Sequence, residues 1–148
     1  MTSWITVDGA SLRAARIRAG LTQHQLARLI DVAGGERISL WELGTSAPRA
    51  ETLPKLAKAL AVPIAEMLPE RDGPPDFQRL RLLAGYSQQS IAERVHVSKA
   101  TVARWDRGHF ARTPPKRELR DLGKLLGVSA KVVEAALDLS RQEASRPE

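Results

Sequence analysis

The chain has 148 residues and a formal net charge of +6, and 43% of its residues are hydrophobic while only 4% are aromatic. It contains no cysteine, which excludes a disulfide framework, a thiolate zinc site and cysteine nucleophile chemistry. Cores built from Leu, Ile, Val and Ala favour helices over a β-sandwich, and the length allows one domain of ordinary size or two small ones.

The positive charge is uneven along the chain. Residues 1–70 hold 8 Lys or Arg against 7 Asp or Glu, whereas residues 71–148 hold 15 against 10. This excess indicates a polyanionic partner, with nucleic acid ahead of an anionic membrane surface. No apolar stretch approaches the roughly 20 residues of a membrane helix, and the first residues lack a secretion signal. We therefore expect a soluble, cytoplasmic protein without a membrane partner.

The sequence repeats itself at an offset of about 65 residues. Gly20-Leu-Thr-Gln23 recurs as Gly85-Tyr-Ser-Gln88, and Trp41-Glu-Leu-Gly44 recurs as Trp105-Asp-Arg-Gly108. Between the copies, residues 69–76 contain three prolines and a glycine, which stop a helix and favour a stiff connection. We therefore predict two domains, residues 8–70 and 77–140, joined by a linker at 71–76 and followed by a disordered polar tail at 141–148.

Each copy begins with a helical pattern. In the first copy Thr22 is a suitable N-cap with Gln25 in capping-box position, and Leu26, Leu29 and Ile30 follow on one apolar face. The equivalent helix of the second copy is predicted to start at residue 87.

A turn and a second helix follow in both copies. Asp31 and His96 occupy the turn position that normally has positive φ, which both residue types tolerate at modest strain. The next helix is expected from Ile38 to residue 43 in the first copy and from residue 98 to 107 in the second, where Gly44 and Gly108 stop it. A helix, a tight turn and a helix with a polar outer face make a helix-turn-helix arrangement.

These residues, Gly-Leu-Thr-Gln at the first helix and Ile-Ser-x-Trp-Glu-x-Gly at the second, resemble the Cro/XRE-type, lambda-repressor-like helix-turn-helix domains. The resemblance implies an all-α fold of two consecutive five-helix bundles. It also implies a sequence-specific transcriptional regulator of double-stranded DNA, repressor-like and of bacterial or phage type, located on the nucleoid. In such domains the later helix of this pair is the third helix of the bundle, and it enters the major groove and reads base edges.

The resemblance assigns roles by position. In the second copy, Arg and Lys would donate to guanine and an Ala methyl would pack on thymine, so the expected base contacts are Ser98, Lys99, Ala100 and Arg104. The expected phosphate contacts are Thr22, Gln23, Ser87, Gln88, Arg107 and Arg112. Arg112 lies in a loop that is two residues longer than the corresponding loop of the first copy.

The first copy departs from the family pattern. It has one extra residue before Ile38, and Leu40 stands where a basic residue would precede the Trp. Its candidate base contacts are Gly34, Gly35, Glu36, Arg37 and Ser39. Domain 2 is therefore expected to dominate, while domain 1 either touches DNA or has a supporting or partner-binding role.

Several residues are expected to be structural. Family geometry implies two ion pairs, Arg16 with Glu42 and Arg81 with Asp106, and helical spacing favours core packing for Trp41 and Trp105. Trp4 lies outside both repeats, where it could form a short strand, cover the bundle or contact another subunit.

Other function classes find little support. The three histidines are too scattered for a metal site, and no phosphate-binding loop, nucleophile elbow or acid-base pair is present. We expect no enzyme, no cofactor and no small-molecule effector, and a monomer or weak dimer on an asymmetric site. The alternative is a protein-interaction module, such as an antitoxin or adaptor, in which DNA binding is secondary.

Overall fold

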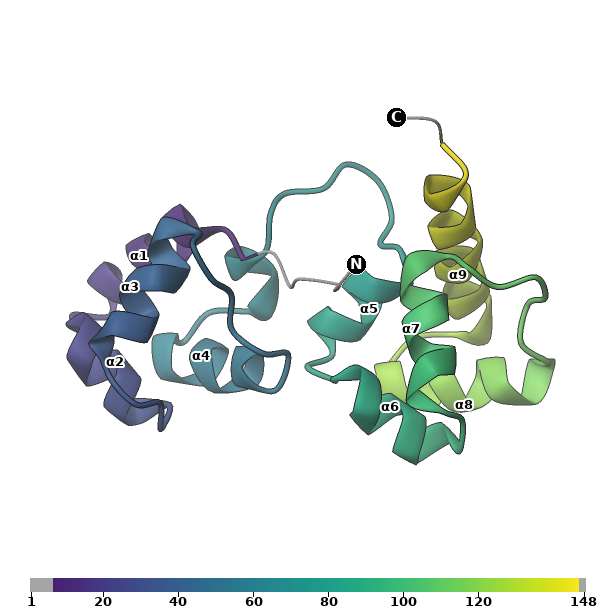
Figure 1. The fold of residues 1–148 in the computed structure, drawn as a ribbon, viewed down its shortest axis with the longest axis horizontal. Coiled ribbons are helices and arrows are strands. Elements are labelled where there is room, and N and C mark those ends of the chain that lie inside the picture. The colour runs from purple at the N-terminus through teal and green to yellow at the C-terminus, as the bar shows by residue number, and fades with distance from the viewer. Residues whose placement is uncertain (1–6, 147–148) are drawn as a thin grey trace. The chain divides into compact units, whose positions relative to one another are not determined.

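The computed structural model describes residues 7–146, and within them the chain is all-α, with nine α-helices, one 3-10 helix and no strand (Figure 1). The chain divides into two compact units, Met1–Glu70 and Arg71–Glu148, hereafter unit 1 and unit 2. The all-α fold class that the resemblance implies is thus confirmed. Trp4 lies outside the described residues, so its role stays open.

Unit 1 follows the predicted helical pattern. Its elements are α1 (Gly9–Arg18), α2 (Gln23–Leu29), α3 (Gly35–Leu43), α4 (Thr52–Leu60) and the 3-10 helix η1 (Ile64–Met67). Thr22 Oγ1 accepts the backbone N–H of Gln25, whose side chain in turn accepts the backbone N–H of Thr22, so the capping box forms. Asp31 takes the expected left-handed turn position, with φ 61°.

Unit 2 contains α5 (Phe77–Leu83), α6 (Gln88–Val95), α7 (Lys99–Arg107), α8 (Lys116–Leu126) and α9 (Ala130–Ala144). A side-chain oxygen caps four of these helices by accepting the backbone N–H three residues later; the caps are Asp76, Ser87, Ser98 and Ser129. His96, with φ 60°, forms the turn between α6 and α7. The sequence therefore specifies both the starts of these helices and the turn between them.

Both predicted core tryptophans are buried. Trp41 is 5% exposed and Trp105 is 3% exposed. In unit 2 the Trp105 ring meets the Phe77 ring edge to face, with centroids 5.6 Å apart. The α7 helix is thus packed on its inner side and leaves its opposite side to solvent.

The fifth element differs in length between the units. In unit 1 it is the four-residue η1, bracketed by Pro63 and Pro69, whereas in unit 2 it is the fifteen-residue α9. The tail expected from residue 141 is helical as far as Ala144, because the α9 pattern continues there and Glu143 binds Arg71. The end of unit 2 is therefore longer and better ordered than the composition of its tail indicated.

The last turns of α9 pass directly over the end of α7. A Cβ atom added to Gly108 would lie 2.1 Å from the Ser140 backbone oxygen. The equivalent Gly44 of unit 1 has no heavy atom within 4 Å of an added Cβ. Both glycines have positive φ, 71° and 78°, so they share one conformational strain and differ in the close approach of a helix.

We predict that Gly108→Ala destabilises unit 2 much more than Gly44→Ala destabilises unit 1. Gly44→Ala introduces only the strain of a left-handed backbone and should lower the unfolding free energy by about 1 kcal/mol. Gly108→Ala also displaces α9 and should lower it by about 3 kcal/mol or more. Urea unfolding followed by tryptophan fluorescence measures both. Equal losses of unfolding free energy in the two variants would contradict the packing of α9 on Gly108.

Candidate nucleic-acid interface

A buried ion pair fixes the third helix of unit 2. Arg81 on α5 binds Asp106 on α7 through two bonds, Nε to Oδ1 at 3.2 Å and Nη2 to Oδ2 at 2.6 Å. Its Nη1 donates to the Tyr86 backbone oxygen at 2.7 Å, and Gln88 Nε2 donates to Asp106 Oδ2 at 2.8 Å. We call Arg81, Asp106 and Gln88 the Arg81 triad.

Unit 1 repeats this arrangement. Arg16 Nε lies 2.6 Å from Glu42 Oε2, Arg16 Nη1 donates to the Leu21 backbone oxygen at 2.8 Å, and Gln23 Nε2 donates to Glu42 Oε1 at 3.1 Å. The hydrogen bond that Arg16 donates to Glu42 raises the pKa of the Arg16 guanidinium above its ordinary value, against an opposing effect of burial. The structure thus brings together Arg16 and Glu42, as well as Arg81 and Asp106, the four residues that the sequence paired.

The two glutamines have a contact that the sequence did not indicate. Gln23 and Gln88 were expected at phosphates, yet each side-chain amide donates to the carboxylate of its triad. One Nε2 hydrogen remains available, together with backbone N–H groups in the first helical turn, which have no partner within the helix. Any phosphate contact at these positions would therefore combine a positioned amide with a helix N-terminus.

The outer side of α7 exposes all of its expected DNA contacts. We define the α7 face by its exposed residues, which are Ser98, Lys99, Ala100, Arg104 and Arg107. Ser98 Oγ caps the helix and also lies 2.8 Å from Thr101 Oγ1, so its hydroxyl is partly occupied. No ion pair within residues 7–146 engages Lys99, Arg104 or Arg107. The α7 face is therefore positively charged, and no ion pair in the described part of the chain neutralises its three cations.

A cleft beside the α7 face holds further positive charge. It has a volume of about 430 Å³ and lies where the long α7–α8 loop turns back; its charged lining consists of Arg104, Arg112 and one carboxylate, that of Glu118, with His109 beside them. Arg141 from α9 stacks over the Phe110 ring, 5.4 Å from its centroid, and holds this loop. The structure therefore brings Arg112 and Arg104 to one cleft.

The corresponding surface of unit 1 is less complete. Glu36 and Arg37 are exposed on the first turn of α3, and Ser39 is half-buried. A Cβ added to Gly35 would lie 3.0 Å from the His24 backbone nitrogen, so this glycine lets α3 approach the start of α2. Gly35 is therefore placed at a helix-helix contact, and only its neighbours project from the surface.

Three exposed positions are leucine in unit 1 and arginine in unit 2. The repeat pairs Leu29, Leu40 and Leu43 with Arg94, Arg104 and Arg107, in that order. The side chains of the three leucines are 62%, 41% and 74% exposed, in the same order. Leu29 was expected on one apolar face with Leu26 and Ile30, which are buried, yet it is exposed, and its pairing with Arg94 was not recognised from the sequence although the repeat contained the signal. Unit 1 thus has an apolar surface where unit 2 has a cationic one.

Among the described residues, no group of His, Asp and Glu side chains could hold a metal ion. None of the helices in that part of the chain is both long and apolar enough to cross a membrane. Thr22 and Ser87, expected near phosphates, serve as helix caps at the starts of α2 and α6.

Comparisons with known proteins agree with this geometry. A family model described as helix-turn-helix matches the chain twice, at residues 12–67 and 77–133. The cryptic phage CTXphi transcriptional repressor RstR of Vibrio cholerae is 36% identical over 63 residues, which are 43% of this chain and 56% of the repressor. The chain thus spans little more than half the length of that relative. No solved structure gives a significant match.

We predict that Arg81→Gln lowers the unfolding free energy by about 3 kcal/mol or more, because it leaves the Asp106 carboxylate buried without its cation. The side chains of Arg81 and Asp106 are 3% and 1% exposed. Arg18→Gln is the control, since its ion pair with Glu66 is exposed and should contribute less than about 1 kcal/mol. Urea titration measures the unfolding free energy of both variants. Similar losses of unfolding free energy in the two variants would contradict a structural role for the Arg81 triad.

Proposed function

Because the chain belongs to the Cro/XRE-type helix-turn-helix family, we propose that it is a transcriptional regulator, repressor-like, that reads duplex DNA mainly through α7. The family is a DNA-binding type rather than an enzyme family, and the phage relative is a transcriptional repressor. The observation that carries the proposal is the α7 face, with three exposed cations on the helix that the Arg81 triad fixes. Binding to chromosomal DNA would place the protein on the nucleoid.

The chemistry of the α7 face suits the major groove. Arg104 and Lys99 can donate to O6 and N7 of guanine, and the Ala100 methyl can contact a thymine methyl. Arg107 at the helix end and Arg112 in the adjacent loop would bind phosphates, together with the first turn of α6. Base contacts then supply specificity, and phosphate contacts supply most of the salt-dependent affinity.

Unit 1 has the smaller part in this proposal. Its surface leucines replace three arginines of unit 2, so it attracts a polyanion weakly and offers chiefly Glu36 and Arg37 to bases. Since the two units present different side chains, the DNA site should be asymmetric, and a monomer or weak dimer suffices to bind it. Regulation would come from occupancy or a protein partner rather than from a small-molecule effector.

The exposed leucines of unit 1 favour a second candidate function. Ile17, 54% exposed, lies in the same groove as Leu43, between α1 and α3. Exposed apolar residues in one groove are typical of a protein-binding surface. An adaptor or antitoxin would use this surface and bind DNA only secondarily. Absence of salt-dependent DNA binding by the full chain would favour this candidate.

We predict that Arg104→Ala weakens binding to a selected duplex by about 1 to 3 kcal/mol and relaxes the preference at one base position. Arg37→Ala, on the corresponding helix of unit 1, should weaken binding less, because unit 2 dominates. Fluorescence anisotropy on duplexes with single base changes measures both effects. A larger loss for Arg37→Ala than for Arg104→Ala would reverse the proposed roles of the two units.

Arg107→Ala should behave differently from Arg104→Ala. As a phosphate contact, Arg107 adds affinity for every sequence, so its loss weakens all duplexes alike and lowers the slope of log affinity against log salt by about one unit. Leu43→Ala is the matched control at the equivalent position of unit 1, where the salt slope should stay unchanged. A sequence-dependent effect of Arg107→Ala would instead make it a base contact.

A further inference from the structure

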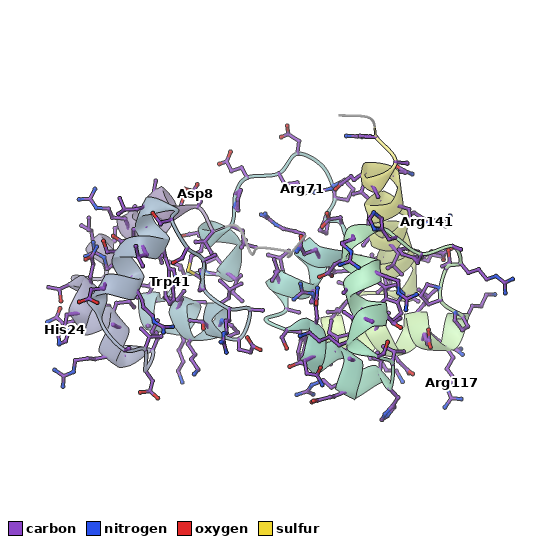
Figure 2. All side chains as sticks on the ribbon, in the orientation of Figure 1. Asp8, His24, Trp41, Arg71, Arg117 and Arg141 are labelled. Carbon is purple, nitrogen blue, oxygen red and sulfur yellow. The ribbon has the colours of Figure 1, made fainter. Side chains whose placement is uncertain are left out.

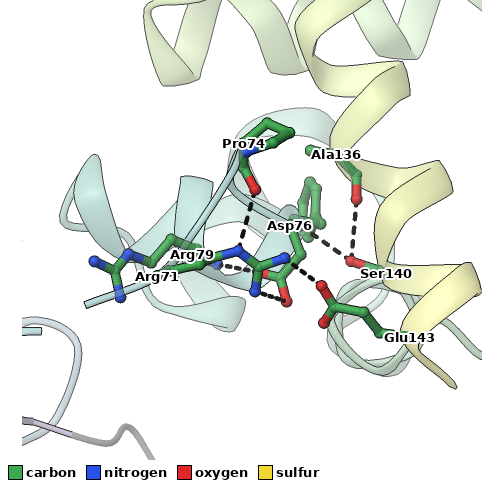
Figure 3. Close-up of polar contacts among 8 residues, drawn as sticks. Arg71, Pro74, Asp76, Arg79, Ala136, Ser140 and Glu143 are labelled. Carbon is green, nitrogen blue, oxygen red and sulfur yellow. Dashed lines mark hydrogen bonds and ion pairs between the residues drawn. The ribbon is translucent and has the colours of Figure 1, made fainter. Parts of the chain in front are cut away.

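The predicted linker is bound to the far end of unit 2. The Arg71 guanidinium reaches three acceptors, which are the Pro74 backbone oxygen at 3.1 Å, Asp76 Oδ2 at 3.5 Å and the Glu143 carboxylate (Figure 3). Glu143 is separated from Arg71 by 72 positions in the sequence. We call Arg71, Asp76 and Glu143 the Arg71 clasp, which joins the start of residues 71–76 to the last turns of α9.

The other end of this segment is also attached to α9. The Phe77 backbone N–H donates to Ser140 Oγ at 3.0 Å in a buried hydrogen bond, and Ser140 Oγ donates to the Ala136 backbone oxygen at 3.2 Å. Asp76 Oδ1 accepts the Arg79 backbone N–H at 2.9 Å and so begins α5. Residues 71–77 are therefore held at both ends within unit 2.

The clasp is partly shielded from water. The side chains of Arg71, Asp76 and Glu143 are 26%, 15% and 33% exposed. The hydrogen bond that Arg71 donates to Glu143 raises the pKa of Arg71, and burial raises the pKa of Asp76. A carboxylate that is largely removed from water depends on its cation more than an exposed one does. Figure 2 shows where Arg71 lies on the segment that leads into unit 2 and where Arg141 lies on α9.

A turn brings Arg71 back to Pro74. Gly73 has φ 84°, a left-handed conformation that a side chain would strain, and the two prolines after it stiffen the chain. Composition alone makes residues 71–76 an extended spacer, but the turn and the clasp together shorten it.

We propose that the Arg71 clasp sets the length of the tether between the two units and thereby the spacing between the DNA segments they bind. The spacing part rests on the proposed function. Leu68 is buried and Pro69 has an interaction of its own, so the connection runs from Pro69 to Arg71 and spans at most about 7 Å. With the clasp open it would run from Pro69 to Asp76 and span up to about 25 Å. The difference of about 18 Å corresponds to about five base pairs of duplex.

Glu143→Ala removes the contact between Arg71 and α9, while the sequence of residues 71–79 and the acceptors of Arg71 at Pro74 and Asp76 are unchanged. Glu134→Ala is the matched control, since Glu134 is exposed on the same helix and has no ion pair in the part of the chain that the structure describes. Limited trypsin digestion of the full chain measures access to Arg71, whose guanidinium must leave the clasp to enter the protease. Cleavage after Arg71 should be roughly fivefold faster in Glu143→Ala and unchanged in Glu134→Ala.

General destabilisation is distinguished within the same digestion. Cleavage after Arg120, in the middle of α8, should stay unchanged in both variants if only the clasp has opened. Equal rates after Arg71 in the wild type and Glu143→Ala would overturn the clasp. So would a parallel rise after Arg120, because the Arg71 site would then report only lower stability of unit 2.

The spacing is tested with a duplex that the full chain selects from a random pool, lengthened by one to five base pairs between the segments that the units contact. The wild type should lose about tenfold in affinity at the first insertions, whereas Glu143→Ala and Arg71→Gln should tolerate several more. Identical spacing profiles would overturn the proposal. A chain that selects no duplex overturns the proposed function and the spacing claim together, while the trypsin result still decides whether the clasp holds residues 71–76.

Discussion

A buried arginine bound through two bonds to a carboxylate is the interaction on which each helix-turn-helix unit depends. The arginine comes from the first helix of the unit, the carboxylate from the end of the third, and a glutamine from the start of the second completes the triad. Because a buried charge without a partner is costly, the three helices are constrained to meet at this point. The orientation of α3 and α7 follows from it.

The two units share this arrangement of three helices but differ in the surface that the third helix exposes. Trp105 packs inward and leaves the α7 face outside, where arginines stand at positions that are leucine in unit 1. In unit 2 α9 also crosses Gly108 and binds the Arg71 segment, whereas η1 of unit 1 is a single short element. The additional contacts of unit 2 thus gather around α7 and around the segment that leads to unit 1.

Local rules were sufficient to predict most of the fold from the sequence. Caps such as Thr22, the turn at His96 and the spacing before Trp105 act over a few residues and are readable directly. Contacts between distant segments were not readable in the same way. The amide of Gln88 meets a carboxylate 18 positions away, and Arg71 meets Glu143 across 72, so neither pattern nor propensity indicated them. The DNA contacts themselves remain predictions.

Reading of duplex DNA by two unlike units is tested most directly by letting the full chain select duplexes from a random DNA pool and measuring the affinity of the selected duplex against salt. It predicts one asymmetric sequence that contains guanine, bound more weakly as salt rises because phosphate contacts release counterions. A pool without enrichment, or a palindrome bound by a symmetric dimer, would contradict reading of DNA by two unlike units of one chain.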